Sequence, residues 1–284
     1  MKPSDNADQI AQWNNLSGPR WVAQQVQLDA QLESLGEAAL ARLSPRPGWR
    51  VLDVGCGCGS TSLRLAQRVG PAGHVTGLDV SRVMLDRARE RLLEDGVAHV
   101  AFVEADAQTH RFLGAPFDAL YSRFGVMFFA DPEAALRNLR AALAPGAPVA
   151  FVAWRPMALN PWMGVPLAAA QRQVSAAPLP PPPPHAPGPF GFGDDTRTLD
   201  LFARAGFVNA AAEPLDVTLL LAGGADLATT VEQCLQVGPC AAILREHPAQ
   251  AGAVRDAVSE ALRPYVTAVG VALPGAVWIY TARA

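Results

Sequence analysis

Residues 50–59 read Arg-Val-Leu-Asp-Val-Gly-Cys-Gly-Cys-Gly, and this stretch decides the fold. Val51, Leu52 and Val54 form the short apolar run of a buried parallel strand. Three glycines alternate with cysteines after it, and a helical pattern with hydroxyl-bearing cap candidates begins at Ser60. A strand, a glycine turn and a helix start expose backbone N–H groups at one place, and glycine lets a ligand approach them. The stretch therefore predicts a binding site for a small molecule.

Composition narrows the kind of protein that carries this site. The chain has 284 residues, 50% of them hydrophobic, and a formal net charge of −3, which argues against nucleic acid or an anionic membrane as the main partner. Residues 1–12 lack the basic start and apolar core of a signal peptide, and no apolar run reaches the ~18 residues of a membrane span. We therefore expect a cytoplasmic protein with a small-molecule partner.

The four cysteines do not suggest a metal site or a disulfide framework. Cys56 and Cys58 lie inside the glycine turn, and Cys234 and Cys240 lie far away in the sequence. None of them has the spacing of a zinc-ligand pair. We expect small packed thiols in a reducing compartment, and no metal.

Upstream of the glycine turn, residues 13–43 have apolar residues near helical spacing. Ser17-Gly18-Pro19 interrupts this pattern and predicts two helical segments. We expect a helical arm or cap over residues 1–44, followed by the main domain over residues 45–284. Trp13 and Trp21 of the arm either fold over the ligand site or pack in the core, and the sequence does not decide between the two.

Downstream, strand and helix patterns alternate. Strands are expected at 74–79, 100–103, 117–122 and 148–154, and helices at 60–69, 81–94 and 132–143. Asp131-Pro132-Glu133 is a strong start for the last of these helices. The alternation predicts an α/β fold with a parallel, doubly wound sheet and a ligand at the carboxyl ends of its strands.

The regular alternation stops after residue 154. Residues 155–195 are rich in proline and glycine, including Pro180 to Pro184, and we expect a lid or linker there. A helix from Asp194 to about Ala205, a strand at 217–221, a helical stretch at 225–266 and a final strand at 277–281 follow.

Acidic residues near the turn indicate the class of ligand. The dinucleotide fingerprint has a sixth-place glycine where this chain has Ser60, and Asp53 would repel a pyrophosphate but can help to hold an amino group. Asp79 ends the second strand, where a carboxylate can accept hydrogen bonds from ribose hydroxyls. Asp106 can meet an adenine amine, and Met84 either packs on the adenine face or belongs to the core. These residues favour a zwitterion that contains a nucleoside.

Several motifs, taken together, resemble class I S-adenosylmethionine-dependent methyltransferases, and most closely the methyltransferase type 11 and ubiquinone/menaquinone-biosynthesis-like branch. The resemblance covers roughly residues 45–155 by spacing and motif, and more loosely the remainder of the chain. Its motifs are Val51 to Gly59, Gly77-Leu78-Asp79, Glu104 to Ala107, Ser122 to Pro132, Asn160-Pro161-Trp162, Pro187 to Phe190, and Ala205-Gly206-Phe207. It implies a Rossmann-like fold with a seven-stranded, mostly parallel sheet, and lid insertions at about 155–195 and 225–266.

The resemblance also implies roles for single residues. Gly55, Gly57 and Gly59 would pass the methionine part of the cofactor, and Ser122 and Arg123 would lie near the methionine carboxylate or the substrate. The chain departs from the usual family motif at two positions, Cys58 in the turn and Ala147 after Pro145-Gly146. Neither departure removes a charge or a required hydrogen-bond donor. The whole implied cofactor site is Asp53, Gly55, Gly57, Gly59, Asp79, Val80, Met84, Asp106, Ala107, Ser122 and Arg123.

The expected chemistry is an in-line displacement of a methyl group from a sulfonium, so alignment and exclusion of water matter most. The sequence has no evident catalytic constellation, and His185 in the proline-rich segment is the one histidine that we single out as a candidate base. Aromatic residues are candidates for a wall around an apolar acceptor. These are Trp13, Trp21, Phe128, Trp162, Phe190 and Phe192.

Three functions stay open from the sequence. The first is methyl transfer to a small-molecule acceptor at O, S, N or C. The second is a non-catalytic S-adenosylmethionine-binding module, suggested by the missing base. The third is a nicotinamide-dependent dehydrogenase, which Ser60 and Asp53 disfavour. The oligomeric state is also open, with a homodimer as one alternative.

Overall fold

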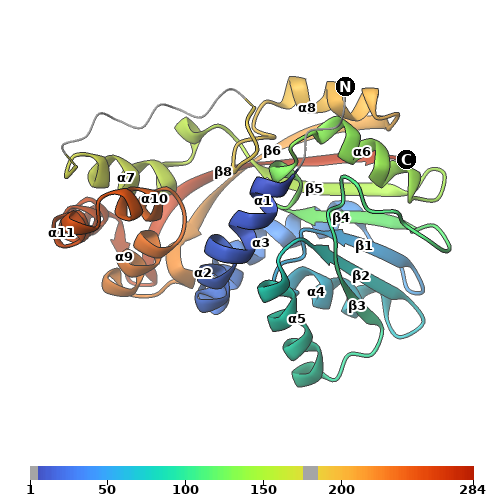
Figure 1. Ribbon diagram of the computed structural model, residues 1–284, viewed down its shortest axis with the longest axis horizontal. Helices are drawn as coiled ribbons and strands as arrows, with labels where there is room; N and C mark the ends of the chain where they lie inside the picture. The colour runs from blue at the N-terminus through green and yellow to red at the C-terminus, as the bar shows by residue number, and fades with distance from the viewer. Residues whose placement is uncertain (1–5, 175–184) are drawn as a thin grey trace.

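The computed structural model describes residues 6–174 and 185–284. Seven strands follow one another across a central sheet in the order β3-β2-β1-β4-β5-β8-β6, and a two-residue strand, β7, pairs with β8 outside this path (Figure 1). The strands are β1 (Arg50–Val54), β2 (His74–Asp79), β3 (Val100–Glu104), β4 (Ala119–Arg123), β5 (Pro148–Trp154), β6 (Val208–Leu220), β7 (Val266–Thr267) and β8 (Gly270–Arg283).

The predicted doubly wound sheet is confirmed. Strands β1 to β5 pair in parallel, and β8 joins them antiparallel to β5 and to β6. Strand order reverses between β1 and β4, and a switch point of this kind opens a crevice at the carboxyl ends of the two strands. The glycine turn follows β1 directly, so it lies at this crevice.

Three helices make the crossovers of the parallel part, as their sequence patterns predict. They are α4 (Ser60–Val69), α5 (Arg82–Asp95) and α6 (Pro132–Ala141). The Asp131 side chain accepts a hydrogen bond from the backbone N–H of Ala134 at 3.0 Å, which confirms the predicted start of α6. Helix α8 (Asp195–Arg204) is capped in the same way by Asp194. Between β4 and α6, a short helix η2 (Val126–Phe128) carries the chain over the crevice.

The N-terminal part is helical but breaks at a different point from the predicted one. Helix α1 (Ala7–Gln12), a π-helical turn η1 (Trp13–Ser17) and α2 (Gly18–Ala23) run on without a break through Ser17-Gly18-Pro19, because Pro19 falls in the first turn of α2, where its missing N–H has no cost. The break falls at Gln24, whose φ of −109° and ψ of 14° leave the helical region before α3 (Gln25–Leu43).

Helix α3 packs against β4, β5 and β8, so this part of the chain covers the sheet as well as the crevice. The division into an arm of residues 1–44 and a domain of residues 45–284 stays a prediction.

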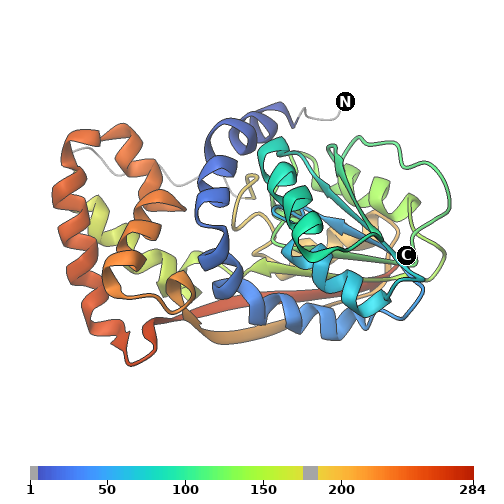
Figure 2. The ribbon, with the colours of Figure 1, turned by 90° about the horizontal axis from the view of Figure 1, so that it is seen from below.

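A second group of helices lies beyond the end of the sheet. Strands β6 and β8 are longer than the predicted 217–221 and 277–281, and their extended ends run out to these helices (Figure 2). The group contains η3 (Met157–Leu159), α7 (Pro161–Gln171), η4 (Leu221–Gly223), α9 (Leu227–Gln236), α10 (Pro239–Glu246), η5 (Pro248–Gln250), α11 (Ala251–Leu262) and η6 (Arg263–Tyr265). We call α7, α9, α10 and α11 the helical lid.

The residues of the helical lid come in part from the two predicted insertions, 155–195 and 225–266. Residues 225–266 are mostly helical, as expected, and α7 comes from the proline-rich insertion at 155–195. The run Pro180 to Pro184 lies outside the described residues. Helix α7 packs against α10 and α11, so the two insertions form one unit although they are far apart in the sequence.

Asn160 fixes the start of α7 and is fully buried. Its side-chain nitrogen donates to the carbonyls of Arg155 (2.8 Å) and Ala276 (3.2 Å), and its oxygen accepts from the N–H groups of Ala276 (2.9 Å) and Trp162 (3.1 Å). These bonds join α7 to β8, so one side chain anchors the lid to the sheet.

We expect Asn160→Ala to lower the free energy of unfolding by about 2–3 kcal/mol, because it leaves several buried polar groups without partners. Urea unfolding followed by circular dichroism measures this. Asn15→Ala, at an exposed position, is the control and should change stability little. Equal stabilities of the two variants would mean that Asn160 does not anchor the lid.

Candidate active site

The glycine turn is held in place by β2. The backbone N–H groups of Gly55 and Cys56 donate to the carbonyl of Leu78 at 2.8 and 3.2 Å. Gly55 has a φ of +70°, and a Cβ there would lie 2.4 Å from the Cα of Gly125, in the loop after β4. Only glycine allows this close approach of the two loops. The turn therefore forms a backbone wall on one side of the crevice.

Asp79 braces the turn from the end of β2. Its carboxylate accepts hydrogen bonds from the N–H of Gly57 at 2.8 Å and from the N–H of Ser81 at 2.9 Å. Burial raises the pKa of this carboxyl, and the backbone hydrogen bonds oppose the shift. Asp79 thus has a structural task in the turn besides any contact with a ligand.

One continuous cavity of about 450 Å³ opens at the crevice. Its first half is lined by the glycine turn and by the ends of β2 and β3, with Gly55, Gly57, Asp79, Val80, Met84, Asp106 and Ala107. Its second half extends under the lid, where residues of α7, α9 and α10 line it. Most of the predicted cofactor residues and parts of both predicted lid insertions therefore line one cavity.

Three predicted cofactor residues do not line this cavity. Asp53 is fully buried and accepts hydrogen bonds from the hydroxyls of Thr61 (2.6 Å) and Ser62 (2.7 Å), so it ties β1 to the start of α4. Ser122 donates to the carbonyl of Val54 at 2.7 Å and joins β4 to β1. Gly59 caps α4, where a Cβ would lie 2.8 Å from the ring of Phe102. Their tasks are in the framework of the turn.

Burial raises the pKa of the Asp53 carboxyl from 3.8 to about 6, so the contribution of this group to the stability of the fold depends on pH. A folded-state pKa above the unfolded value means that this group favours folding at low pH. The contribution is full below about pH 4 and is lost as the pH rises through 6.

Asp53→Asn should therefore gain stability relative to the native protein as the pH rises from 4 to 7. The shift corresponds to at most about 3 kcal/mol. Urea unfolding at both pH values measures the difference, with Asp95→Asn at an exposed position as the control. A stability difference that does not depend on pH would show that Asp53 titrates normally.

Three other predicted residues also stay outside the cavity, namely Phe190, Phe192 and His185. Phe190 packs against the core while its neighbour Pro189 lines the cavity, and Phe192 is buried in the core. His185 is exposed and does not line the cavity, so the structure gives no support to this histidine as a base. His185 begins an irregular stretch over residues 185–193, in which Pro187 and Pro189 are also exposed.

The remaining predicted aromatic residues do build a wall. Trp13 packs edge-on against Phe128, with ring centroids 5.2 Å apart, and Trp21 lies 6.0 Å from Trp13. On the lid side, Trp162 lies 4.9 Å from Trp154. All five line the cavity, including Trp13 and Trp21 of the N-terminal helices.

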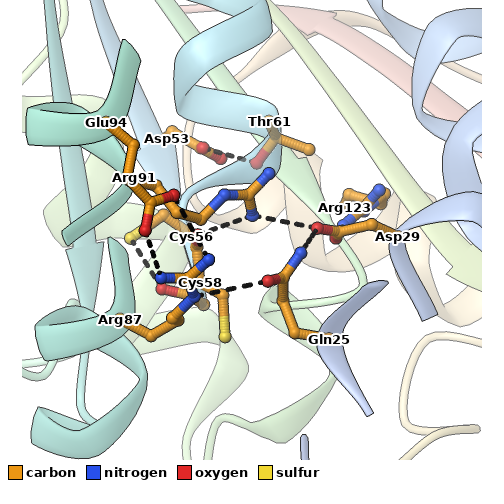
Figure 3. A network of polar contacts seen from close by, with 11 residues as sticks. Gln25, Asp29, Asp53, Cys56, Cys58, Thr61, Arg87, Arg91, Glu94 and Arg123 are labelled. Carbon is orange, nitrogen blue, oxygen red and sulfur yellow. Dashed lines mark hydrogen bonds and ion pairs between the residues drawn. The ribbon is translucent and has the colours of Figure 1, made fainter. Parts of the chain in front are cut away.

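A polar network joins the N-terminal helices to the glycine turn (Figure 3). The Asp29 carboxylate in α3 forms two ion pairs. One is with the guanidinium group of Arg91 in α5 at 2.9 Å, and the other is with that of Arg123 at the end of β4 at 3.3 Å. Arg91 also donates to the carbonyl of Cys58 at 2.9 Å, and Gln25 donates to Asp29 at 2.6 Å. Within this network, Asp29 and Arg123 line the cavity, so a guanidinium group paired with a carboxylate faces it.

The four cysteines are free and all line the cavity. Burial raises the pKa of Cys58, Cys234 and Cys240 to about 12 and that of Cys56 well above its usual value. They are therefore protonated thiols near neutral pH, as expected for packed cysteines. Among the described residues, no group of histidine, cysteine and acidic side chains could hold a metal ion.

Comparison with known proteins agrees with this geometry. A family described as "Methyltransferase domain" matches residues 51–146, from β1 to the turn before β5. Over residues 51–146, this protein carries a methyltransferase domain of this family. The match covers the glycine turn, Asp79 and Asp106, and the lid lies outside it.

The methyltransferase domain is similar to two groups of curated enzymes. It is 42% identical over 102 residues to the ubiquinone/menaquinone biosynthesis C-methyltransferase UbiE of Ectopseudomonas mendocina, covering 36% of this chain and 40% of that one. It is 35% identical over 107 residues to the aklanonic acid methyltransferase DauC of a Streptomyces species, covering 38% and 49%. The chain thus spans less than half the length of these relatives.

A solved structure shares most of the fold. The [4+2]-cyclase SpnF has a TM-score of 0.52 and 23% identity to this chain, covering 88% of it and 80% of SpnF. Because this neighbour is titled a cyclase, the methyltransferase fold by itself does not name the reaction. The reaction has to be argued from the site.

The sequence analysis missed several residues that line the cavity. They are Asn6, Gln9, Asp29, Trp154 and Gln233, among others. Trp154 could have been proposed from the sequence, because it is the last residue of a predicted parallel strand and ligands bind at the carboxyl ends of such strands. The others come from helices whose orientation depends on tertiary packing.

In the described part of the chain, no helix is long and apolar enough to cross a membrane.

Proposed function

We propose that this protein binds S-adenosylmethionine in the half of the cavity next to the glycine turn and transfers its methyl group to a small, largely apolar acceptor under the lid. One observation supports this most strongly. A single cavity joins the glycine turn, Asp79 and Asp106 to a chamber with aromatic and aliphatic walls. Cofactor and acceptor would thus be side by side and screened from water, as a one-step displacement needs.

The fit to the cofactor can be judged at the end of β3. Asn6 and Gln9 of the N-terminal helices line the cavity there, and each has a buried side-chain oxygen without a hydrogen-bond partner among residues 6–174 and 185–284. Asn6 also donates to Asp106 at 3.3 Å, so its side chain lies next to Asp106 at the end of β3. An adenine amine, with two N–H donors, matches this set of acceptors. The residues fit the group.

The methionine end fits the other side of the glycine turn. Arg123, which pairs with Asp29, brings a positively charged guanidinium group to the cavity. A carboxylate is attracted by this charge. Asp79 would keep the turn in shape and contribute acceptors on the ribose side.

The bound cofactor supplies a methyl group already activated on a sulfonium. The chain has to hold the acceptor in line with it and to exclude water. Among the described residues, no histidine lines the cavity, and Asp29, Asp79 and Asp106 are all engaged in hydrogen bonds. We therefore infer an acceptor that is nucleophilic with little help from a base, such as an acidic phenol, an enol or a thiol.

The names of the two curated relatives point to acceptors of quinone biosynthesis and to aklanonic acid. We propose an acceptor of comparable kind, with attack from oxygen, sulfur, nitrogen or carbon left open. A cytoplasmic location and the absence of a nucleic-acid partner remain part of this proposal, and a homodimer remains one alternative.

Incubation of the protein with methyl-labelled S-adenosylmethionine and a mixture of small phenols, quinols and thiols tests the proposal. Mass spectrometry should find a labelled product together with S-adenosylhomocysteine. Cofactor binding without any labelled product would favour the non-catalytic module instead. No binding of the cofactor would reject both.

A further inference from the structure

Gln233 of α9 is a polar side chain in the acceptor half of the cavity. It is 5% exposed, and its side-chain nitrogen is buried with no hydrogen-bond partner in the described parts of the chain. Two other glutamines that line the cavity are engaged. Gln31 accepts from the N–H of Ala222 at 3.0 Å, and Gln236 accepts from the side chain of Gln24 at 2.7 Å. Gln233 therefore differs from its neighbours.

The surroundings of Gln233 make this unpaired nitrogen costly. The lid side of the cavity is formed mainly by apolar side chains and thiols, namely Trp162, Met163, Pro166, Cys234, Val237 and Cys240. A buried amide donor without a partner destabilises the folded protein, because it has lost its hydrogen bonds to water. Arg245 of α10 also lines the cavity, but it is exposed, so the amide is the buried donor.

We propose that Gln233 selects the acceptor by donating a hydrogen bond from its side-chain amide to a carbonyl oxygen of an otherwise apolar, ring-containing molecule. This inference rests on the proposed function and adds a substrate class to it. The amide is neutral, so it matches a neutral carbonyl oxygen. The apolar wall around it accommodates the ring system, and an acceptor that lacks the oxygen leaves the donor unpaired.

Two compounds with the same carbon skeleton test the selection. 1-Tetralone carries one carbonyl oxygen, and tetralin has none. Quenching of tryptophan fluorescence reports binding, since Trp21, Trp154 and Trp162 line the cavity. In the presence of saturating S-adenosylhomocysteine, we expect the native protein to bind 1-tetralone about 3–10-fold more tightly than tetralin.

Gln233→Met keeps the length of the side chain and removes the donor. This variant should bind both compounds equally, whereas the exposed neighbour Glu232→Gln should keep the native preference. Gln233→Met should also raise the melting temperature by about 2–4 °C, because it removes an unpaired buried amide. A merely structural glutamine would lower it.

The proposal is overturned if the native protein shows no preference for 1-tetralone, if it binds neither compound, or if Gln233→Met keeps the preference. A lower melting temperature of Gln233→Met would also count against it. Calorimetric titration with S-adenosylhomocysteine separates this inference from the proposed function. Native affinity for that ligand in Gln233→Met together with a lost preference supports both, and no affinity in the native protein rejects the proposed function alone.

Discussion

Gly125→Ala should abolish tight cofactor binding and destabilise the protein. A Cβ at this position would lie 2.5 Å from the carbonyl oxygen of Val54 and 2.7 Å from the Cα of Gly55. Both are backbone atoms, so the loop after β4 would have to withdraw from the glycine turn. We expect the affinity for S-adenosylhomocysteine to fall about 100-fold and the free energy of unfolding to fall by about 2–4 kcal/mol.

Isothermal titration calorimetry and urea unfolding measure these two effects. Gly164→Ala is a matched control, because Gly164 lies within α7 and a Cβ there meets no atom within 4 Å. It should leave the affinity unchanged and stabilise the helix by about 0.5–1 kcal/mol. Native affinity in Gly125→Ala would mean that the contact between the two loops does not shape the site.

Asp79→Ala is expected to have the second large effect. The sequence assigns to Asp79 only a contact with ribose, whose loss would weaken binding several-fold. In the structure the same carboxylate also holds the N–H groups of Gly57 and Ser81. Removing it leaves both N–H groups without their partner and loosens the turn. We therefore expect about a 100-fold loss of affinity for S-adenosylhomocysteine and a lower melting temperature.

Asp79→Asn should lie between the native protein and Asp79→Ala, because the amide keeps one acceptor oxygen and places a donor against the second N–H. Asp86→Asn, an exposed acid on α5 that pairs with Arg89, is the control and should bind as the native protein does. Titration calorimetry with each variant gives the four affinities. If Asp79→Ala bound S-adenosylhomocysteine as tightly as the native protein, its place in the site would be misassigned.

Local sequence signals predict the part of the fold that surrounds the glycine turn. A strand, three glycines and a helix start are contiguous, and Asp131-Pro132 marks a helix start within one turn. Such features depend on neighbouring residues alone, so the strands β1 to β5 and the crossover helices agree with expectation. Arg123 was also found, since it ends a parallel strand at the ligand edge.

The orientation of single side chains could not be read in the same way. Asp53 and Ser122 belong to the correct strands, but their side chains bond to Thr61, Ser62 and the carbonyl of Val54. Which face of a strand meets the ligand depends on the packing of α4 and of the loop after β4. The sequence therefore indicates which strands border the cavity, but not the direction in which each side chain on them points.

Long-range contacts were the hardest to predict. Gln233 and Asn6 are more than 200 residues apart in the sequence, yet both line one cavity, because β6 and β8 bring the lid back toward the N-terminal helices. No local pattern marks either residue. The unpaired amides become visible only when the burial of each atom is known.

Calorimetric titration of the native protein with S-adenosylhomocysteine and, in parallel, with NADH tests the central claim most directly. We predict saturable binding of one S-adenosylhomocysteine per chain and no saturable binding of NADH. Tight binding of NADH without binding of S-adenosylhomocysteine would contradict the account and favour a dehydrogenase.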